Sequence, residues 1–180
     1  MKTTLQRLLI PLLLAAALDL HAQQVPWRDR LYGAMPSMGR HNWIVVADPA
    51  FPLFNSPGLE VMVTGMSQAD LLTEVVDLLS RTKHVRPIYY MDSELPLVPE
   101  RDADGIGAYR AQIATLLKNN VSSAPDDELM AKIEDAARDY QVLVLKSNTM
   151  LPYTTVYIEL DTGYWSADAE RRLRAGMDGK

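Results

Sequence analysis

Residues 38–52 read Met-Gly-Arg-His-Asn-Trp-Ile-Val-Val-Ala-Asp-Pro-Ala-Phe-Pro. A glycine turn with basic and polar side chains comes first, and the uninterrupted apolar run at 44–47 then predicts a strand that is buried on both faces of a sheet. Pro49 and Pro52 end this strand, because proline has no N–H to donate to a neighbouring strand. The carboxylate of Asp48 therefore stands at the end of a buried strand, where a charge without a partner is strongly unfavourable.

Two interpretations of Asp48 follow from its position. In open α/β sheets, ligands bind beyond the carboxyl ends of the strands, which makes Asp48 the first candidate for a binding group. Alternatively, Asp48 only caps the turn at Pro49 by accepting hydrogen bonds from nearby backbone N–H groups. Spacing alone favours neither interpretation.

The rest of the chain alternates between strand and helix patterns. Strands are predicted at 61–63, 87–91, 142–145 and 155–160, and the last of these is reached either by a hairpin or by a crossover. Helices are predicted at 27–35, from a Ser67 cap to about residue 79, and at 106–117, 126–137 and 167–177, whereas 94–104 and 122–125 have the composition of loops. Because acids, Asp48 and Asp92, close two strands that flank a helix, this order predicts an α/β domain with a parallel sheet and a site at one edge.

Composition sets limits on the class of protein. The 180 residues, 48% hydrophobic and 23% charged, suit one globular domain, and the net charge of −5 argues against nucleic-acid partners and anionic membrane surfaces. Cysteine is absent, and the three histidines, His21, His41 and His84, have no metal-binding spacing. Gly105 and Gly107 lack the strand and the third glycine of a dinucleotide fingerprint. We therefore expect neither a metal nor a cofactor.

Residues 1–22 have the pattern of a signal peptide. Lys2 and Arg7 precede a short apolar run at 8–18, and Leu-His-Ala at 20–22 offers a cleavage site. The run is shorter than the ~20 apolar residues of a membrane-spanning helix, contains Pro11 and is closed by Asp19. We expect cleavage near Ala22, no stable membrane anchor, and a single domain at 23–180 that a bacterium exports to the periplasm or secretes. An uncleaved membrane anchor is the alternative.

Polar side chains gather at the predicted turns and strand ends, namely His41, Asn42, Asp48, Asp92, Asn148, Tyr153 and Thr155. Carboxylates, amides and hydroxyls beside tyrosine and tryptophan suit a neutral polyol, since each hydroxyl of a sugar needs a donor and an acceptor. Taken alone, these residue types are compatible with any small polar ligand.

A family resemblance narrows this choice. Residues 38–52 resemble the opening motif of the D-ribose pyranase/L-fucose mutarotase (RbsD/FucU) family, in which a Gly-His turn leads into a strand that ends Asp-Ala-x-x-Pro. Residues 86–91, 109–110 and 152–156 resemble later family segments in the same order, the last of them a Tyr-x-Asn motif, so that the resemblance spans about residues 31–165. It implies a three-layer α/β/α fold with a mainly parallel, mixed sheet, a ring-like homo-oligomer, and an isomerase that interconverts the cyclic forms of a monosaccharide.

The resemblance also implies roles for individual residues. His41 and Asp48 are the implied catalytic pair, and the implied sugar-binding residues are Arg40, Asn42, Asp48, Tyr153 and Thr155. The chain departs from the family pattern at two of these positions, because Arg40 stands where the family histidine follows the glycine, and Thr155 replaces the asparagine of the late motif. Three interpretations stay open: a mutarotase that uses His41, Asp48 and Tyr153, a non-catalytic sugar-binding or scaffold protein of the same fold, and a structural oligomer without a ligand.

Overall fold

The computed structural model describes residues 25–118 and 120–178, so the predicted signal peptide lies outside the described residues. Within these ranges, no helix has the length and apolar character needed to cross a membrane. The helices are α1 (Trp27–Ala34), α2 (Gln68–Arg81), α3 (Ile106–Leu117), α4 (Asp126–Asp139) and α5 (Ala167–Asp178), with short 3-10 helices η1 (Met35–Ser37) and η2 (Leu95–Leu97). The strands are β1 (Trp43–Ala47), β2 (Leu59–Val63), β3 (Val85–Asp92), β4 (Val121–Ala124), β5 (Val142–Lys146) and β6 (Val156–Thr162).

The strands form one mixed sheet in the order β2-β5-β1-β6-β3-β4. Strand β6 runs antiparallel to both of its neighbours, β1 and β3, while the other pairings are parallel. The carboxyl ends of β1 to β5 therefore meet at one edge of the sheet, together with the start of β6. We call this the carboxyl edge, and the opposite one the amino edge.

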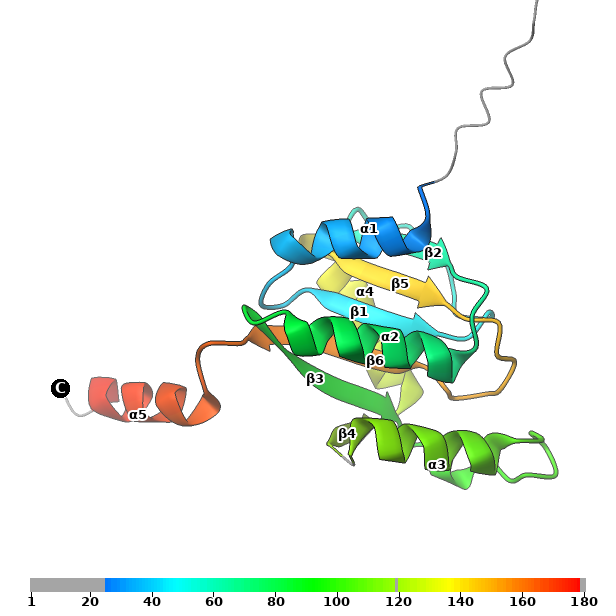
Figure 1. Cartoon of the computed structure of the whole chain (residues 1–180). Coiled ribbons are helices and arrows are strands. Elements are labelled where there is room, and N and C mark those ends of the chain that lie inside the picture. Colours follow the sequence, from blue (N-terminus) through cyan, green and yellow to red (C-terminus); the bar gives the residue numbers. More distant parts are fainter. Residues whose placement is uncertain (1–24, 119, 179–180) are drawn as a thin grey trace, which may run out of the picture.

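Helices cover both faces of the sheet, as the three-layer prediction requires (Figure 1). Side chains of β1 alternate between two apolar cores: Ile44 and Val46 join α1, α2 and α3, whereas Val45 and Ala47 join α4 on the other face. All five residues of β1 are buried. The apolar run thus marks a central strand with packing on both sides, and the α/β/α fold with a mainly parallel sheet is confirmed. Helix α5 lies apart from these layers (Figure 1).

The local signals in α2 agree with the structure. The Ser67 hydroxyl accepts a hydrogen bond from the backbone N–H of Asp70 at 3.2 Å and donates one to the Asp70 carboxylate at 2.7 Å. This reciprocal arrangement begins the helix where the cap predicted it. The apolar face that follows is buried, with Leu71, Leu72 and Val75 fully inaccessible to solvent.

Three expectations are corrected or resolved by the tertiary structure. The predicted loop at 122–125 is wrong, because Val121–Ala124 forms β4, which pairs in parallel with β3. Its two serines interrupt the apolar pattern by which a strand is recognised in a sequence. The strand forms because it pairs with β3. Residues 94–104 have the composition of a loop, which predicts an exposed segment, yet Leu95 and Ala103 are buried. Strand β6 is reached by a crossover rather than a hairpin, since it inserts between β1 and β3 and does not pair with β5.

Candidate functional site at the carboxyl edge

Asp48 follows β1 directly. One of its carboxylate oxygens caps the turn, and the other lies where a ligand group is expected. Oδ1 accepts a hydrogen bond from the backbone N–H of Ala50 at 2.7 Å, which caps the turn at Pro49. Oδ2 accepts one from the hydroxyl of Thr155 at 3.4 Å. The side chain therefore both holds the turn and presents an oxygen toward the start of β6.

A cavity of about 350 Å³ opens beside this contact. Its size falls in the range of small-molecule sites, roughly 300–1,000 Å³. Phe51, Met130 and Pro152 form apolar parts of its wall, and its polar groups come from five positions: Asp48, Asp92, Asp126, Tyr153 and Thr155. We call it the carboxyl-edge cavity. Although three aspartates line it, no three His, Asp or Glu side chains in the described ranges are grouped so that they could share a metal ion.

A buried amide holds the start of β6 against β1. Gln68, fully buried at the start of α2, donates from Nε2 to the carbonyl oxygens of Val46 at 2.7 Å and Thr154 at 2.8 Å. The hydroxyl of Tyr109 donates to the same Thr154 oxygen at 2.7 Å. Buried hydrogen bonds of this kind fix the backbone. As a result, Thr155, which is only 3% exposed, is kept next to Asp48.

Tyr153 lies at the mouth of the cavity. Its backbone has a φ of 57°, in the left-handed region that non-glycine residues seldom adopt. Its side chain is 41% exposed and still lines the cavity. The strained turn therefore places a phenol at the rim, where it can contact both a bound molecule and solvent.

Asp92, the last residue of β3, is the buried acid of the cavity. It is 2% exposed, and its Oδ1 has no hydrogen-bond partner among the described residues. Burial raises its pKa to about 7, because the charged form is poorly solvated there, and the negative charges of Asp126, Glu94 and Asp48 act in the same direction. A carboxyl with such a pKa exchanges protons near neutrality, which is the property of an acid–base group.

Asp126 completes the acidic lining from the first turn of α4. The hydroxyl of Tyr157 donates to its Oδ1 at 3.4 Å. Burial raises the pKa of Asp126, and this hydrogen bond opposes the shift. Burial also raises the pKa of Tyr157, so the phenol keeps its proton for this contact. From the sequence, Asp126 is predicted only to begin a helix. Its place just after a strand would have marked it as a site residue, but the pattern does not predict β4.

His41 lies at the opposite end of β1. Its backbone N–H donates to the carbonyl oxygen of Leu160 at 2.9 Å, in a turn where His41 has a φ of 72°. The ring packs against Tyr140 with centroids 5.2 Å apart, and Nδ1 is 4.0 Å from Oε1 of Glu159. The histidine is therefore a residue of the amino edge.

The neighbours of His41 share this position. Arg40 is exposed, with Nε 3.8 Å from Oδ1 of Asp161. The Asn42 side chain accepts a hydrogen bond from the backbone N–H of Gly39 at 2.6 Å and so closes its own turn. Of the predicted site residues, the structure brings Asp48, Tyr153 and Thr155 together and separates them from the residues 40–42 of the same chain. Asn148 follows the carboxyl end of β5 at the same edge but is not part of the cavity wall, and its side chain donates to the carbonyl oxygen of Gly65 at 2.9 Å.

Comparison with known proteins bears on the fold. No protein-family model matches the sequence, and no curated protein shows significant similarity to it. Among solved structures, Bacillus subtilis RbsD complexed with D-ribose matches with a TM-score of 0.52 and 12% identity, over 74% of this chain and 92% of that one. The fucose mutarotase from Streptococcus pneumoniae in complex with L-fucose matches with a TM-score of 0.50 and 17% identity, over 78% and 98%. The chain thus has the fold of RbsD and fucose mutarotase.

Proposed function

We propose that the protein binds a monosaccharide in the carboxyl-edge cavity and interconverts the cyclic forms of that sugar. The observation that carries this proposal is the contact of Asp48 with Thr155 in the wall of a cavity of about 350 Å³. This cavity lies at the sheet edge where α/β folds bind their ligands. Two proteins of the same fold were solved with D-ribose and L-fucose bound, which supports a sugar as the ligand.

The lining suits the recognition of a sugar. The free lone pairs of the carboxyl groups accept hydrogen bonds from sugar hydroxyls, and the hydroxyls of Tyr153 and Thr155 both donate and accept. Phe51, Met130 and Pro152 supply apolar contacts for the C–H faces of the ring. The ligand class we assign is therefore a neutral monosaccharide.

The proposed reaction is an acid- and base-assisted ring opening. A base accepts the proton of the anomeric hydroxyl while an acid donates a proton to the ring oxygen, the bond between C1 and the ring oxygen breaks, and C1 becomes an aldehyde. Ring closure reverses both transfers and yields the other cyclic form. Positioned acids and bases accelerate such steps by ~10²–10⁴-fold. Asp48 is placed to accept the first proton.

Residues 40–42 reach a carboxyl-edge cavity only through a second copy of the chain, because β1 separates them from Asp48 in their own. We propose that the protein forms a ring-like homo-oligomer in which one copy brings this turn to the cavity of the next. Apolar side chains near the cavity support an interface there: Met150, which lines the space beside Asp48, is 87% exposed, and Leu53 is 78% exposed. Such side chains favour burial against another surface.

Sugar binding without catalysis is the second candidate function. It is favoured by one observation, that Arg40 stands where the family resemblance expects a histidine, and an arginine does not exchange protons at neutral pH. In this case the cavity would hold a sugar and leave its anomers to interconvert at the rate in water.

Nuclear magnetic resonance separates these functions. Saturation transfer with D-ribose, L-fucose and related sugars reports binding, and magnetisation exchange between anomers reports the reaction. We expect both for the wild type, and loss of both for Asp48→Asn with the fold intact. Asp77→Asn is the matched control, because Asp77 is exposed on α2 and pairs with Arg81. Binding without faster exchange would establish the second function, and the absence of binding would overturn both.

We also propose export to the bacterial periplasm or medium, on the basis of residues 1–22. Mass spectrometry of the protein purified from its native host is expected to find a mature N-terminus at Gln23. A full-length chain in the cytoplasmic fraction would contradict this.

A further inference from the structure

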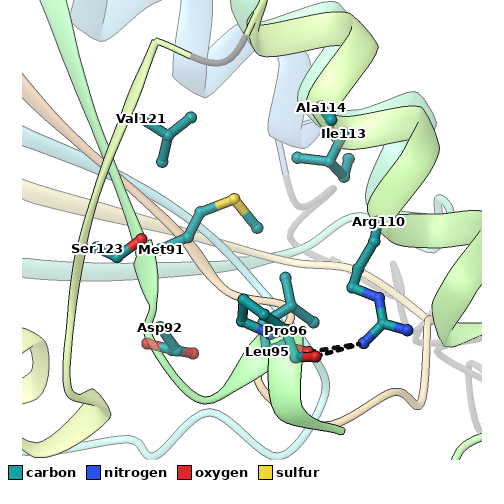
Figure 2. Close-up of a pocket in the computed structure, with 9 residues that line it drawn as sticks. All are labelled: Met91, Asp92, Leu95, Pro96, Arg110, Ile113, Ala114, Val121 and Ser123. Carbon is teal, nitrogen blue, oxygen red and sulfur yellow. Dashed lines mark hydrogen bonds between the residues drawn. The ribbon is translucent and has the colours of Figure 1, made fainter. Parts of the chain in front are cut away.

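Asp92 lies between two cavities. One is the carboxyl-edge cavity, which it shares with Asp48 and Thr155. The other has a volume of about 270 Å³ and lies between the β3–β4 pair and α3. Figure 2 shows Asp92 near one end of this second cavity, with Met91 and Ser123 above it and Ile113 across the space on α3. Asp92 therefore borders a mostly apolar cavity on one side and the candidate sugar site on the other.

The side chains around the second cavity do not stabilise a negative charge on Asp92. Met91, Leu95, Pro96 and Ile113 give it an apolar wall. The nearby cation is Arg110, whose Nη1 donates to the carbonyl oxygens of Leu95 at 3.1 Å, Pro96 at 3.1 Å and Val98 at 2.9 Å, as Figure 2 shows in part. Arg110 thus closes the η2 segment, and none of the ion pairs among the described residues includes Asp92.

The other groups that face Asp92 also favour its neutral form. Negative charges come from three elements, with Asp48 after β1, Glu94 after β3 and Asp126 at the start of α4. The remaining titratable neighbours are the phenols of Tyr109 on α3 and Tyr157 on β6, and burial raises the pKa of both, so they stay neutral. Burial in apolar surroundings and like charges disfavour the same state, the carboxylate. Together they account for a pKa of about 7 for Asp92.

Two of the three carboxyl groups that line the carboxyl-edge cavity, those of Asp48 and Asp92, therefore lie in different environments. Asp48 accepts hydrogen bonds from Ala50 and Thr155, which stabilise a carboxylate, whereas Oδ1 of Asp92 receives none from the part of the chain that the structure describes. An acid–base pair needs one carboxyl that carries a proton and one that can accept a proton. We propose that Asp92 is the general acid of the site, donating its proton to the ring oxygen of the bound sugar while the Asp48 carboxylate accepts the proton of the anomeric hydroxyl.

The step balances within these two groups and the sugar, and it rests on the function proposed above. On opening, the C1–ring oxygen bond breaks, C1=O forms, Asp92 becomes a carboxylate and Asp48 becomes neutral. On closure, the sugar hydroxyl attacks C1 and returns its proton to Asp92, while Asp48 returns its proton to the oxygen on C1. The site is thereby restored without solvent, cofactor or a histidine.

Asp92 can supply the proton within the same copy of the chain. His41 cannot do so, because it lies at the amino edge of the sheet. Among the described residues, Oδ1 of Asp92 is the one buried side-chain atom of the cavity wall that has no hydrogen-bond partner. A purely structural carboxyl in this place would need a hydrogen bond to be tolerated. In the proposed complex, the protonated carboxyl of Asp92 donates to the ring oxygen of the sugar.

The test compares anomer exchange in Asp92→Asn, Asp92→Glu and the wild type, at saturating sugar and as a function of pH. Asp92→Asn keeps shape and polarity but cannot donate a proton, so we expect exchange at saturation to fall at least ~100-fold while the dissociation constant of the sugar changes less than about threefold. Asp92→Glu keeps the carboxyl, and we expect it to recover part of the rate. The wild-type rate is expected to decline above the pKa of Asp92, and the residual rate of Asp92→Asn to lack that decline.

Three outcomes separate the role of Asp92 from the proposed mutarotase activity. Wild-type exchange that Asp92→Asn leaves intact would overturn the role of Asp92 and retain the mutarotase. A loss of sugar binding equal to the loss of rate, with no change in the pH profile, would show a binding group rather than an acid. Absence of exchange in the wild type would overturn the proposed function itself, and the role of Asp92 with it. Asp77→Asn again controls for the loss of one surface charge.

Discussion

His41 and Asp48 flank the same strand, β1, and therefore lie at opposite edges of the sheet. Five residues of strand span roughly 16 Å, too far for two side chains to act on one sugar. In the proposed mechanism, proton transfer between Asp92, Asp48 and the sugar needs no histidine. In the proposed oligomer, a second copy brings His41 to the rim as a binding contact.

We accordingly expect His41→Ala to weaken sugar binding less than tenfold and to leave the exchange rate at saturation within about threefold, measured by the same magnetic resonance exchange. Asp48→Asn provides the comparison. If His41→Ala instead abolished exchange, and subunit mixing with Asp48→Asn restored about a quarter of it, the histidine would be the acid of a neighbouring copy's site.

The contact between Thr155 and Asp48 predicts a second result. Thr155→Val keeps the shape of the buried side chain but removes the hydroxyl that donates to Oδ2 of Asp48 at 3.4 Å. Thr155 lines the cavity, and without its hydroxyl Asp48 is no longer held in place to bind a sugar hydroxyl. A hydrogen bond to a charged group is worth about 1.5 kcal/mol, so we expect loss of that sugar contact to raise the dissociation constant about tenfold. Titration by calorimetry measures this. Thr155→Ser, which keeps the hydroxyl, should bind nearly as the wild type does, and equal affinities for all three proteins would contradict the contact.

The raised pKa of Asp92 predicts a pH dependence of stability. Its value is about 7 in the folded chain and near 3.8 ordinarily. As pH rises from ~4 to ~7, the unfolded chain ionises Asp92 first, so unfolding releases a proton and the free energy of unfolding falls. Asp92→Asn has no such proton to release. The stability of this variant relative to the wild type should therefore increase by about 2 to 4 kcal/mol across this window and level off above it. Urea unfolding at a series of pH values checks this, and a difference that is constant with pH would contradict it.

Gly58 provides a prediction about the fold alone. Its N–H donates to the carbonyl oxygen of Ala137 at 2.9 Å, and a Cβ here would lie 2.0 Å from the carbonyl oxygen of Tyr140. Both oxygens belong to the backbone at the end of α4 and cannot turn away. We expect Gly58→Ala to lower the free energy of unfolding by about 1–3 kcal/mol, seen as a lower Tm.

Gly33→Ala is its matched control. A Cβ at Gly33 in α1 would meet no atom of the described residues within 4 Å, and alanine favours the helix by about 0.5–1 kcal/mol. We expect an unchanged or slightly higher Tm. A similar fall in Tm for both variants would show that the close approach at Gly58 is absent.

The strongest sequence predictions came from signals that act over a few residues. The apolar run and the two prolines locate β1 and leave Asp48 at its end, and Ser67 with Asp70 begins α2 where the structure begins it. Strand β4 escaped prediction because its serines carry no pattern of burial, and its pairing energy comes from β3. Leu95 of η2 is buried because it packs in the core with residues of α3, and such a contact between distant segments has no local signal in the sequence.

The linear order of residues was enough to establish an α/β chain with an acid at the end of its central buried strand, because hydrophobic periodicity and proline geometry are local properties. It did not say which other side chains share a cavity with that acid. Insertion of β6 between β1 and β3 brings Thr155 to Asp48 and aligns Asp92 and Asp126 along the same edge, while the length of β1 carries His41 away. Strand order is set by packing between distant segments. This packing buries the carboxyl of Asp92 and leaves its Oδ1 without a hydrogen-bond partner among the described residues.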